Sequence, residues 1–512
     1  MLARVRSAAL VGLDGFPVDV EVDLSPGLPA FDVVGLPDPA VRESRERVRS
    51  ALRNAGFSFP LRRITVNLAP AHLRKAGPAF DLPIALGVLG ASGQLPAAAL
   101  HRFACIGELG LDGRVLPVKG AICLAEAASD RRLILPAANA AEAAAVMRAQ
   151  FEPVADVGEA VSIIRGTGVR RSRLLLPDPQ QDSGGASQQR EPLPDLAQVR
   201  GQAAARRALE IVAAGGHHAV LVGPPGSGKT FLARCLPGIL PPLSEADRLT
   251  ITKVYSVRGL LPSGGTVATR PFRSPHHTIT AAALIGGGSP PLPGEVSLAH
   301  GGVLFLDELS EFRAGVLDLL RQPLEDGYVQ LVRHRQSFRF PARFSLVGAS
   351  NPCPCGYLGH PRRSCRCREA DLVRYTRRLE GPLADRIDLW VGMAPVSDAD
   401  LFDAAPSEPS ASVSRRVRLA RKRQEVRLRD REFRLNAAMR EDDLPLHCAL
   451  DAPAAALLRR AMQRLDLSAR AVRSTLRVAR TIADLDEAHP DGAPLAPHHV
   501  SEAIQYRRPS WR

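Results

Sequence analysis

Three patterns of hydrophobic and polar residues follow one another along the chain. The first combines alternating runs, such as FPVDVEVDL and RRITVNLAP, with the helical stretch AVRESRERVRSALRNAG. Strict alternation predicts half-buried strands, whereas apolar residues three and four positions apart predict helices. The mixture predicts an α+β domain over residues 1–175.

The second pattern covers residues 197–395. The runs HAVLVG, GGVLFLD and FSLVGAS are short and apolar, and helical stretches separate them. Strands of this kind are buried on both faces, so we predict an α/β core with a parallel sheet. Residues 176–196 are rich in Pro, Gly, Ser and Gln and lack an apolar period, which predicts a linker between the two domains.

The third pattern begins after a loose connector, residues 396–412. Residues 413–512 are helical and basic, as in SRRVRLARKRQEVRLRDREFRL, and predict a helical domain. The chain has 512 residues, enough for about three domains, and its composition is typical of globular proteins. We find no long apolar span and no signal peptide, so we expect a cytoplasmic location without a membrane partner.

The net charge of +14 permits a polyanionic partner such as DNA. Only five of the 67 basic residues are lysines, however. Such an excess of arginine is typical of GC-rich coding, which loads a surface with arginine whatever the function. Charge alone therefore favours nucleic-acid binding only weakly.

A phosphate-binding motif follows the first apolar run of the core. In LVGPPGSGKT, the glycines let backbone N–H groups point inward around phosphate, and the loop opens a helix whose N-terminus favours anions. Lys229 would reach the β- and γ-phosphates of ATP, and the Thr230 hydroxyl would bind Mg²⁺. The predicted nucleotide-binding residues of the loop are Gly223, Pro224, Pro225, Gly226, Ser227, Gly228, Lys229 and Thr230.

The run GGVLFLDEL supplies the second half of this site. Its apolar residues lead into Asp307, predicted to hold Mg²⁺, and Glu308, predicted to polarise the attacking water. An acidic helix start is the alternative interpretation. The order of the phosphate loop, the Asp-Glu pair and a later Asn-Pro favours the catalytic one.

This constellation resembles AAA+ ATPases. The resemblance assigns Asn351, at the tip of the strand between the two phosphate-site strands, to the polar sensor-1 position. GPLADRIDLWV is similar to the segment carrying the arginine finger, Arg386, which acts on a neighbouring subunit; a salt bridge to Asp385 or Asp388 is the alternative. LSARAVRSTLRVARTIADL resembles the lid helix with the sensor-2 arginine, best matched by Arg470, with Arg473 as the competing choice.

The stretch RPFRSPHHTITAAALIGGGSPPLPGEVSLAHGGVLFLDELSEF is similar to the ComM/YifB family of Mg-chelatase-like AAA+ proteins. The resemblance implies a pore-facing insert at 286–294 and a second pore hairpin in EDGYVQLVRHRQSFRFPARF. Arg333, His334 and Arg335 would lie at its tip and contact DNA phosphates, an interpretation favoured over a merely solvated turn. Adjacent His276 and His277 are expected to point apart, so a phosphate-binding or structural role is favoured over metal binding.

The first domain also resembles a known fold. KAGPAFDLPIAL and GELGLDGRVLPVKGAICLAEAA are similar to the Lon protease segments that carry its catalytic serine and lysine. Those positions fall on Ala79 and Ile122, with Lys119 three residues early. A Ser–Lys dyad needs a hydroxyl and an amine. The resemblance therefore implies a Lon-like (ribosomal S5-like) fold without peptidase activity.

Four of the eight cysteines lie in NPCPCGYLGHPRRSCRC, directly after Asn351. Clustered cysteines in a cytoplasmic protein favour metal over disulfides. Cys353, Cys355, Cys365 and Cys367 are therefore candidate ligands of a structural Zn²⁺, although C-x-C spacing is tighter than usual. Free thiols are the next alternative, and disulfides the last.

The family resemblance implies a ring-forming, hexameric ATPase that uses ATP and Mg²⁺ to drive branch migration of DNA during natural transformation. Low sequence specificity is expected of such a motor. The alternative is a chelatase-type ATPase that remodels a protein or metal-insertion partner. An ATP-dependent protease is disfavoured by the missing dyad.

Overall fold

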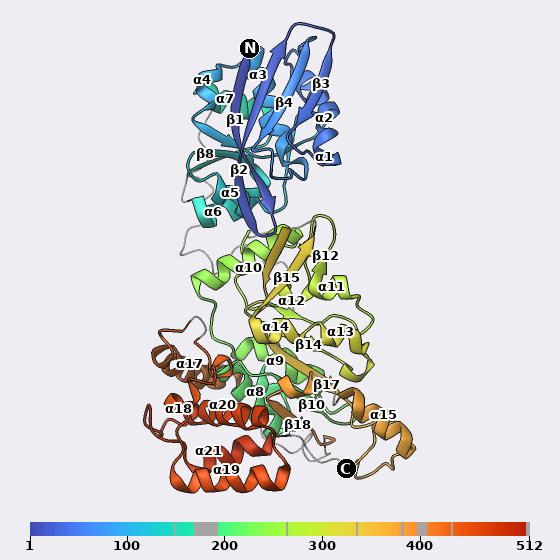
Figure 1. The fold of residues 1–512 in the computed structure, drawn as a ribbon, viewed down its shortest axis with the longest axis vertical. Coiled ribbons are helices and arrows are strands. Elements are labelled where there is room, and N and C mark those ends of the chain that lie inside the picture. Colours follow the sequence, from blue (N-terminus) through green and yellow to red (C-terminus); the bar gives the residue numbers. More distant parts are fainter. Residues whose placement is uncertain are drawn as a thin grey trace.

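The structure is a computed structural model, and it describes residues 1–147, 150–167, 193–262, 265–333, 336–379, 383–396, 407–431 and 434–507. Figure 1 shows an elongated molecule with three parts along its length. The N-terminal domain forms one end, the ATPase core follows, and a layer of C-terminal helices forms the other end.

The N-terminal domain is built on a seven-stranded mixed sheet, in the order β3-β4-β2-β1-β5-β8-β9. The alternating runs noted above form β2 and β4, which pair antiparallel and bury every second side chain. The helix α3 is buried along its whole length against this sheet. The strands are β1 (Leu2–Val11), β2 (Asp14–Ser25), β3 (Ala30–Val34), β4 (Arg63–Ala69), β5 (Phe103–Cys105), β8 (Arg132–Pro136) and β9 (Phe151–Val154), beside the small pair β6 (Glu108–Leu109) and β7 (Val115–Leu116). The helices are α1 (Pro39–Arg42), α2 (Ser44–Asn54), α3 (Asp81–Ala91), α4 (Ala97–Leu100), α5 (Ala121–Ala127), α6 (Ala140–Met147) and α7 (Val157–Arg165).

The ATPase core contains the predicted parallel sheet, in the order β11-β14-β17-β10-β18. The three apolar runs form β10, β14 and β17, which are buried throughout. The strands are β10 (Ala219–Val222), β11 (Phe272–Arg273), β14 (Val303–Leu306), β17 (Ser345–Ser350) and β18 (Leu389–Gly392). The helices are α8 (Ala203–Gly215), α9 (Lys229–Ile239), α10 (Glu245–Arg258), α11 (Ala281–Ile285), α12 (Glu295–Leu298), α13 (Ala314–Asp318), α14 (Arg321–Asp326) and α15 (Glu369–Leu379).

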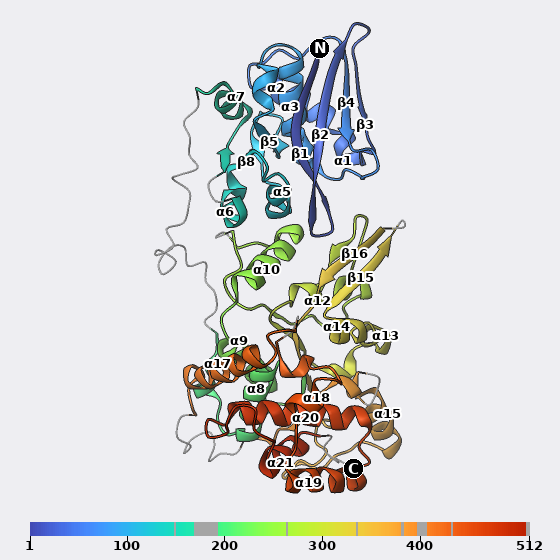
Figure 2. The same ribbon diagram turned by 60° about the vertical axis from the view of Figure 1, so that its left-hand side comes forward.

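Two hairpins project from the core on the side that faces the N-terminal domain (Figures 1 and 2). β12 (Gly286–Gly287) pairs with β13 (Leu292–Pro293) in the predicted insert, and β15 (Tyr328–Arg333) pairs with β16 (Gln336–Pro341) around the predicted tip. Leu331 lies beside Gly286, so the two hairpins touch each other.

The N-terminal domain docks on this same end of the core. Val11 and Leu13, at the turn between β1 and β2, pack against the hydrophobic cluster that contains β16. Ser256 of α10 donates a hydrogen bond of 2.6 Å to Glu142. Ile122, where the resemblance places the Lon lysine, is buried against Val257 of α10. That position therefore serves the contact between domains.

The C-terminal helices share one hydrophobic cluster with α8, α9 and β10. The first of them begins at Ser410, three residues before the predicted start. Asp195 accepts a hydrogen bond of 2.9 Å from the Ser410 N–H, and the Ser410 hydroxyl accepts one of 2.8 Å from the Leu196 N–H. Residues 176–192 of the predicted linker lie outside the described residues. The helices are α17 (Ser410–Arg427), α18 (Leu444–His447), α19 (Ala452–Leu465), α20 (Ala469–Leu485) and α21 (Pro497–Gln505).

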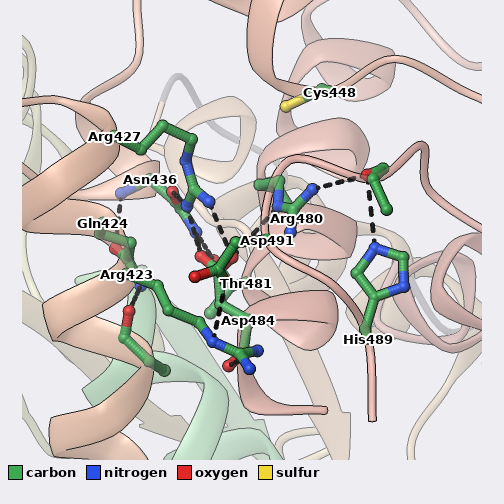
Figure 3. Close-up of polar contacts among 12 residues, drawn as sticks. Arg423, Gln424, Arg427, Asn436, Cys448, Arg480, Thr481, Asp484, His489 and Asp491 are labelled. Atoms are coloured by element: carbon green, nitrogen blue, oxygen red, sulfur yellow. Dashed lines mark hydrogen bonds and ion pairs between the residues drawn. The ribbon is translucent and has the colours of Figure 1, made fainter. Parts of the chain in front are cut away.

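A buried ionic network holds α17 against α20 (Figure 3). The Asp484 carboxylate accepts hydrogen bonds from Arg427 at 2.9 Å, from Asn436 at 2.8 Å and from Arg480 at 3.1 Å. Asp484 and Arg480 are almost fully buried. No helix among the described residues is long and apolar enough to cross a membrane.

Candidate nucleotide site

The phosphate loop lies between β10 and α9, as its motif predicts. Gly226 and Gly228 have φ values of 80° and 87°, a backbone conformation that glycine adopts without strain. The Lys229 ammonium donates hydrogen bonds to the Gly223 and Pro224 carbonyls at 2.7 and 2.9 Å. Burial lowers the pKa of Lys229, and the charge of Asp307 opposes this shift.

The loop, the Asp-Glu pair and Asn351 meet at one edge of the sheet. The Thr230 hydroxyl donates to Asp307 at 2.9 Å, and Lys229 donates to the Asn351 side-chain oxygen at 3.3 Å. Asn351 follows β17, which lies between β10 and β14, the two strands that carry the motifs. This is the position that the AAA+ resemblance implies. The carboxyl ends of parallel strands bring these residues together.

Tyr375 of α15 is a residue of this site that sequence reasoning missed. Its hydroxyl donates to the Asn351 backbone carbonyl at 2.9 Å and also lies 3.0 Å from the Ser310 hydroxyl and 3.1 Å from the Ser350 hydroxyl. Tyr375 therefore ties the segment after Glu308 to the end of β17. Nothing in the motif spacing points to it, because α15 lies beyond the cysteine loop.

Glu308 has a neighbour, His277, that the sequence did not predict. Its carboxylate lies 3.5 Å from His277 Nδ1, and its backbone has a φ of 52°. The expectation that His276 and His277 point apart is wrong, since their ring centroids lie 4.1 Å apart. His277 also makes a T-shaped contact with Phe312, with ring centroids 6.4 Å apart. His277 thus links the segment before the β12–β13 insert to Glu308.

Arg386 lies at the opposite edge of the sheet from the phosphate loop. The loop follows β10, whereas Arg386 precedes β18, which runs parallel to β10. Each strand has four residues, so about 13 Å of sheet separates the two edges. The Arg386 guanidinium is therefore on the far side of the sheet from the nucleotide loop of its own subunit.

Arg470 joins Arg386 on that side. Arg386 donates a hydrogen bond of 2.6 Å to Glu325 of α14, and Arg470 contacts the same carboxylate oxygen. Arg473, the competing sensor-2 choice, contacts Glu441 instead. Glu325 is a further residue that sequence reasoning missed. The salt bridge of Arg386 to Glu325 is one that the sequence did not suggest.

Asp388 fixes the relative position of the two arginines. Burial would raise the pKa of its carboxyl, but hydrogen bonds and the charge of His217 lower it well below the usual range. Asp388 also accepts a hydrogen bond from Ser474, one turn beyond Arg470 on α20. The strand that follows Arg386 and the helix that carries Arg470 are thereby joined through a buried carboxylate.

Family comparisons agree with this architecture. The family described as magnesium chelatase, subunit ChlI, matches residues 195–401; its C-terminal family matches residues 407–507, and a further ChlI family matches residues 20–139. YifB of Salmonella typhimurium is 41% identical over 99% of this chain and 97% of its own length. The competence protein ComM of Haemophilus influenzae is also 41% identical, and the match covers 99% of this chain and 97% of the length of ComM. The chain belongs to the ComM/YifB family of magnesium-chelatase-like AAA+ ATPases. An uncharacterized protein of Mycobacterium tuberculosis is 43% identical over 94% of the chain and 95% of its own length.

The residues of this ComM/YifB protein fit ATP with Mg²⁺. Open space lies where Gly226 and Gly228 would carry side chains, and the buried Ser227 hydroxyl has no hydrogen-bond partner among the described residues. Lys229 and the loop N–H groups would hold the phosphates, and Thr230 and Asp307 would hold the metal. When bound, ATP supplies the phosphoanhydride bond that is hydrolysed.

The remaining predicted residues of this ComM/YifB chain lie in three places: the β15–β16 hairpin, the N-terminal domain and the cysteine loop. Arg333 is exposed at the end of β15. His334 and Arg335, also predicted to contact DNA, lie outside the described residues. Ala79 is buried in the N-terminal domain. The four cysteines that follow Asn351 are brought together, with their sulfur atoms within 4.8 Å of one another.

Proposed function

We propose that this protein is a ring-forming DNA motor that drives branch migration during the uptake and recombination of DNA. The observation that carries the proposal is the β15–β16 hairpin. Its strands and turn, residues 328–341, include Arg333, Arg335 and Arg339 and no carboxylate. An exposed basic hairpin on an ATPase core suits phosphate contacts without base recognition. The name of the competence protein ComM supports a role in DNA uptake.

The arrangement of the arginines supports a ring. Arg386 and Arg470 lie together on the opposite edge of the sheet from their own phosphate loop, as required of groups that serve a neighbour's nucleotide. An arginine supplied in this way stabilises the charge that develops on the transferred phosphoryl group. Glu308, half-exposed beside Asp307, would orient the attacking water and accept its proton. Six subunits is the number that the family resemblance implies.

The first experiment compares ATP hydrolysis with and without a four-way DNA junction. We expect the junction to stimulate hydrolysis several-fold and the protein to move its branch point. Lys229→Ala, which removes the phosphate-binding ammonium, should abolish both activities. A rate unaffected by DNA, with no branch movement, would overturn the proposal.

A pair of arginine variants tests the hairpin itself. Arg333→Ala should weaken junction binding and stimulation while leaving the basal rate intact, because Arg333 has no contact with the phosphate loop. Arg459→Ala removes an exposed arginine from α19, at the far end of the molecule (Figures 1 and 2). This control should bind the junction normally. Equal binding by both variants would count against the hairpin as the DNA contact.

A second candidate function is a chelatase-type ATPase that remodels a protein partner. The matched magnesium chelatase families favour it, since they cover most of the chain. This candidate predicts hydrolysis stimulated by a protein partner and indifferent to the junction. The junction assay above therefore separates the two functions.

A further inference from the structure

The cysteine loop, residues 351–368, has no helix or strand of its own. Irregular loops longer than about 12–15 residues are uncommon in compact domains, and they usually have a function of their own. Cys353 is fully buried, and Cys355, Cys365 and Cys367 are half-buried. The second half of the loop, residues 359–368, is mostly polar and exposed apart from its two cysteines.

Three of the four sulfur atoms are spaced as ligands of one tetrahedral metal ion would be, and Cys367 Sγ lies within 4.8 Å of each of them. Cys353 Sγ lies 3.4 Å from Cys355 Sγ and 3.7 Å from Cys365 Sγ, and Cys355 Sγ lies 3.5 Å from Cys365 Sγ. Four thiolates bound to Zn²⁺ at about 2.3 Å would lie about 3.8 Å from one another. A disulfide would need about 2.05 Å between sulfurs. The observed spacing is therefore that of metal ligands and not of a disulfide.

Backbone N–H groups point at these sulfurs. Leu358 donates to Cys353 Sγ at 3.3 Å, Cys355 to Cys367 Sγ at 3.4 Å, and Cys367 to Cys365 Sγ at 3.5 Å. Hydrogen bonds of this kind favour the thiolate, the form that binds metal, and orient it. The arginines within the loop would offset the negative charge of four thiolates around a divalent ion.

The loop also rests on the nucleotide site. Gly356, which directly follows Cys355, has a φ of 82°. A Cβ at this position would lie 2.7 Å from the Pro225 ring and 3.9 Å from the Asn351 side chain. Pro225 belongs to the phosphate loop, and Asn351 receives a hydrogen bond from Lys229. The position of the cysteine loop thus bears directly on the groups that hold phosphate.

We propose that Cys353, Cys355, Cys365 and Cys367 bind one structural Zn²⁺ that holds the loop against the phosphate-binding loop. Zinc binding gives this segment the fixed shape that its own apolar residues cannot provide. Loss of the metal would let Gly356 move away from Pro225 and loosen the phosphate loop. The inference deepens the proposed ATPase function, but the zinc content does not depend on DNA.

The first test measures metal in the purified full-length protein by mass spectrometry. We expect close to one zinc per chain in the unmodified protein and a large loss of zinc in Cys365→Ser. Cys448→Ser is the matched control, because Cys448 is a buried cysteine outside the cluster, and it should keep its zinc. An unmodified protein without zinc, or a Cys365→Ser variant that retains it, would overturn the proposal.

The second test measures ADP binding before and after zinc is removed by a chelator. Because preorganisation of a loop raises affinity, we expect removal to weaken binding on the order of tenfold and added Zn²⁺ to restore it. Unchanged ADP affinity in zinc-free protein would overturn the link to the phosphate loop. Junction stimulation is measured separately. A failure of the zinc proposal therefore leaves a different signature from a failure of the DNA proposal.

Discussion

His300 shows how one buried side chain can make stability depend on pH. The ring is 5% exposed, and its Nδ1 atom accepts a hydrogen bond of 3.0 Å from the Arg343 N–H, just before β17. Burial lowers the pKa of His300 to about 4, and the positive charge of Arg343 acts in the same direction. The folded ATPase core therefore favours the neutral ring.

We predict that the core loses stability between pH 7.5 and pH 5. In this range the unfolded chain protonates His300, with a pKa near 6.5, while the folded chain does not. The stability is thus fully present above pH 6.5 and lost as the pH falls towards 4, by about 2 kcal/mol at pH 5. Urea unfolding at both pH values measures the loss. His300→Asn, whose side-chain oxygen can accept the same hydrogen bond, should show a smaller loss; equal losses would exclude His300 as the cause.

Individual site residues differ in how far the sequence reveals them. Lys229, Thr230 and Asp307 were predictable because each belongs to a short motif at the end of an apolar run. Glu325 was not, because it lies 61 residues from Arg386 and 145 residues from Arg470 along the chain. Only the fold brings such partners together. A charged residue in a polar stretch carries no local signal of its partner.

Elements were predictable where burial alone decides their form. β10, β14 and β17 are buried on both faces, so their sequences are apolar throughout, and the β15–β16 hairpin follows its alternation. The start of α17 was not predictable, because Asp195, a residue far earlier in the chain, accepts its hydrogen bond. The packing of α17 on α20 depends in the same way on distant polar partners.

We predict that Asp484→Ala destabilises the C-terminal helices by roughly 3–5 kcal/mol, because it leaves Arg480 and Arg427 buried without their carboxylate. Asp491→Ala is the matched control in the same region (Figure 3). Asp491 is 70% exposed and pairs with Arg423 at 3.0 Å, so its loss should cost less than about 1 kcal/mol. Hydrogen exchange of α17 and α20 measures both variants. Similar protection in the two would contradict the role given to the network.

At the scale of the whole molecule, the N-terminal domain and the two hairpins share one end of the core (Figures 1 and 2). Val11 and Leu13 pack against the cluster that contains β16. A movement of the hairpin that we assign to DNA would therefore change its contact with this domain. The sequence predicted both parts but not their contact. Docking depends on apolar residues such as Ile122, which is buried at the contact with α10. From the sequence alone, such a residue is indistinguishable from a core residue of its own domain.

In the proposed ring, a neighbouring subunit completes each nucleotide site. Arg386→Ala subunits keep an intact phosphate loop, and Lys229→Ala subunits keep an intact arginine. Each variant alone should hydrolyse ATP poorly. Mixed in equal amounts and assembled at random, they should recover activity in roughly a quarter of the sites, those that pair an intact loop with an intact arginine.

The decisive measurement is therefore the ATPase rate of this mixture in the presence of a four-way DNA junction. A matched control mixes Arg386→Ala subunits with subunits that carry both substitutions, in which no site can be complete. We predict a rate well above the sum of the separate variants for the first mixture and no gain for the control. A first mixture that gains nothing, although the two variants assemble together, would contradict the shared site and the ring motor built on it.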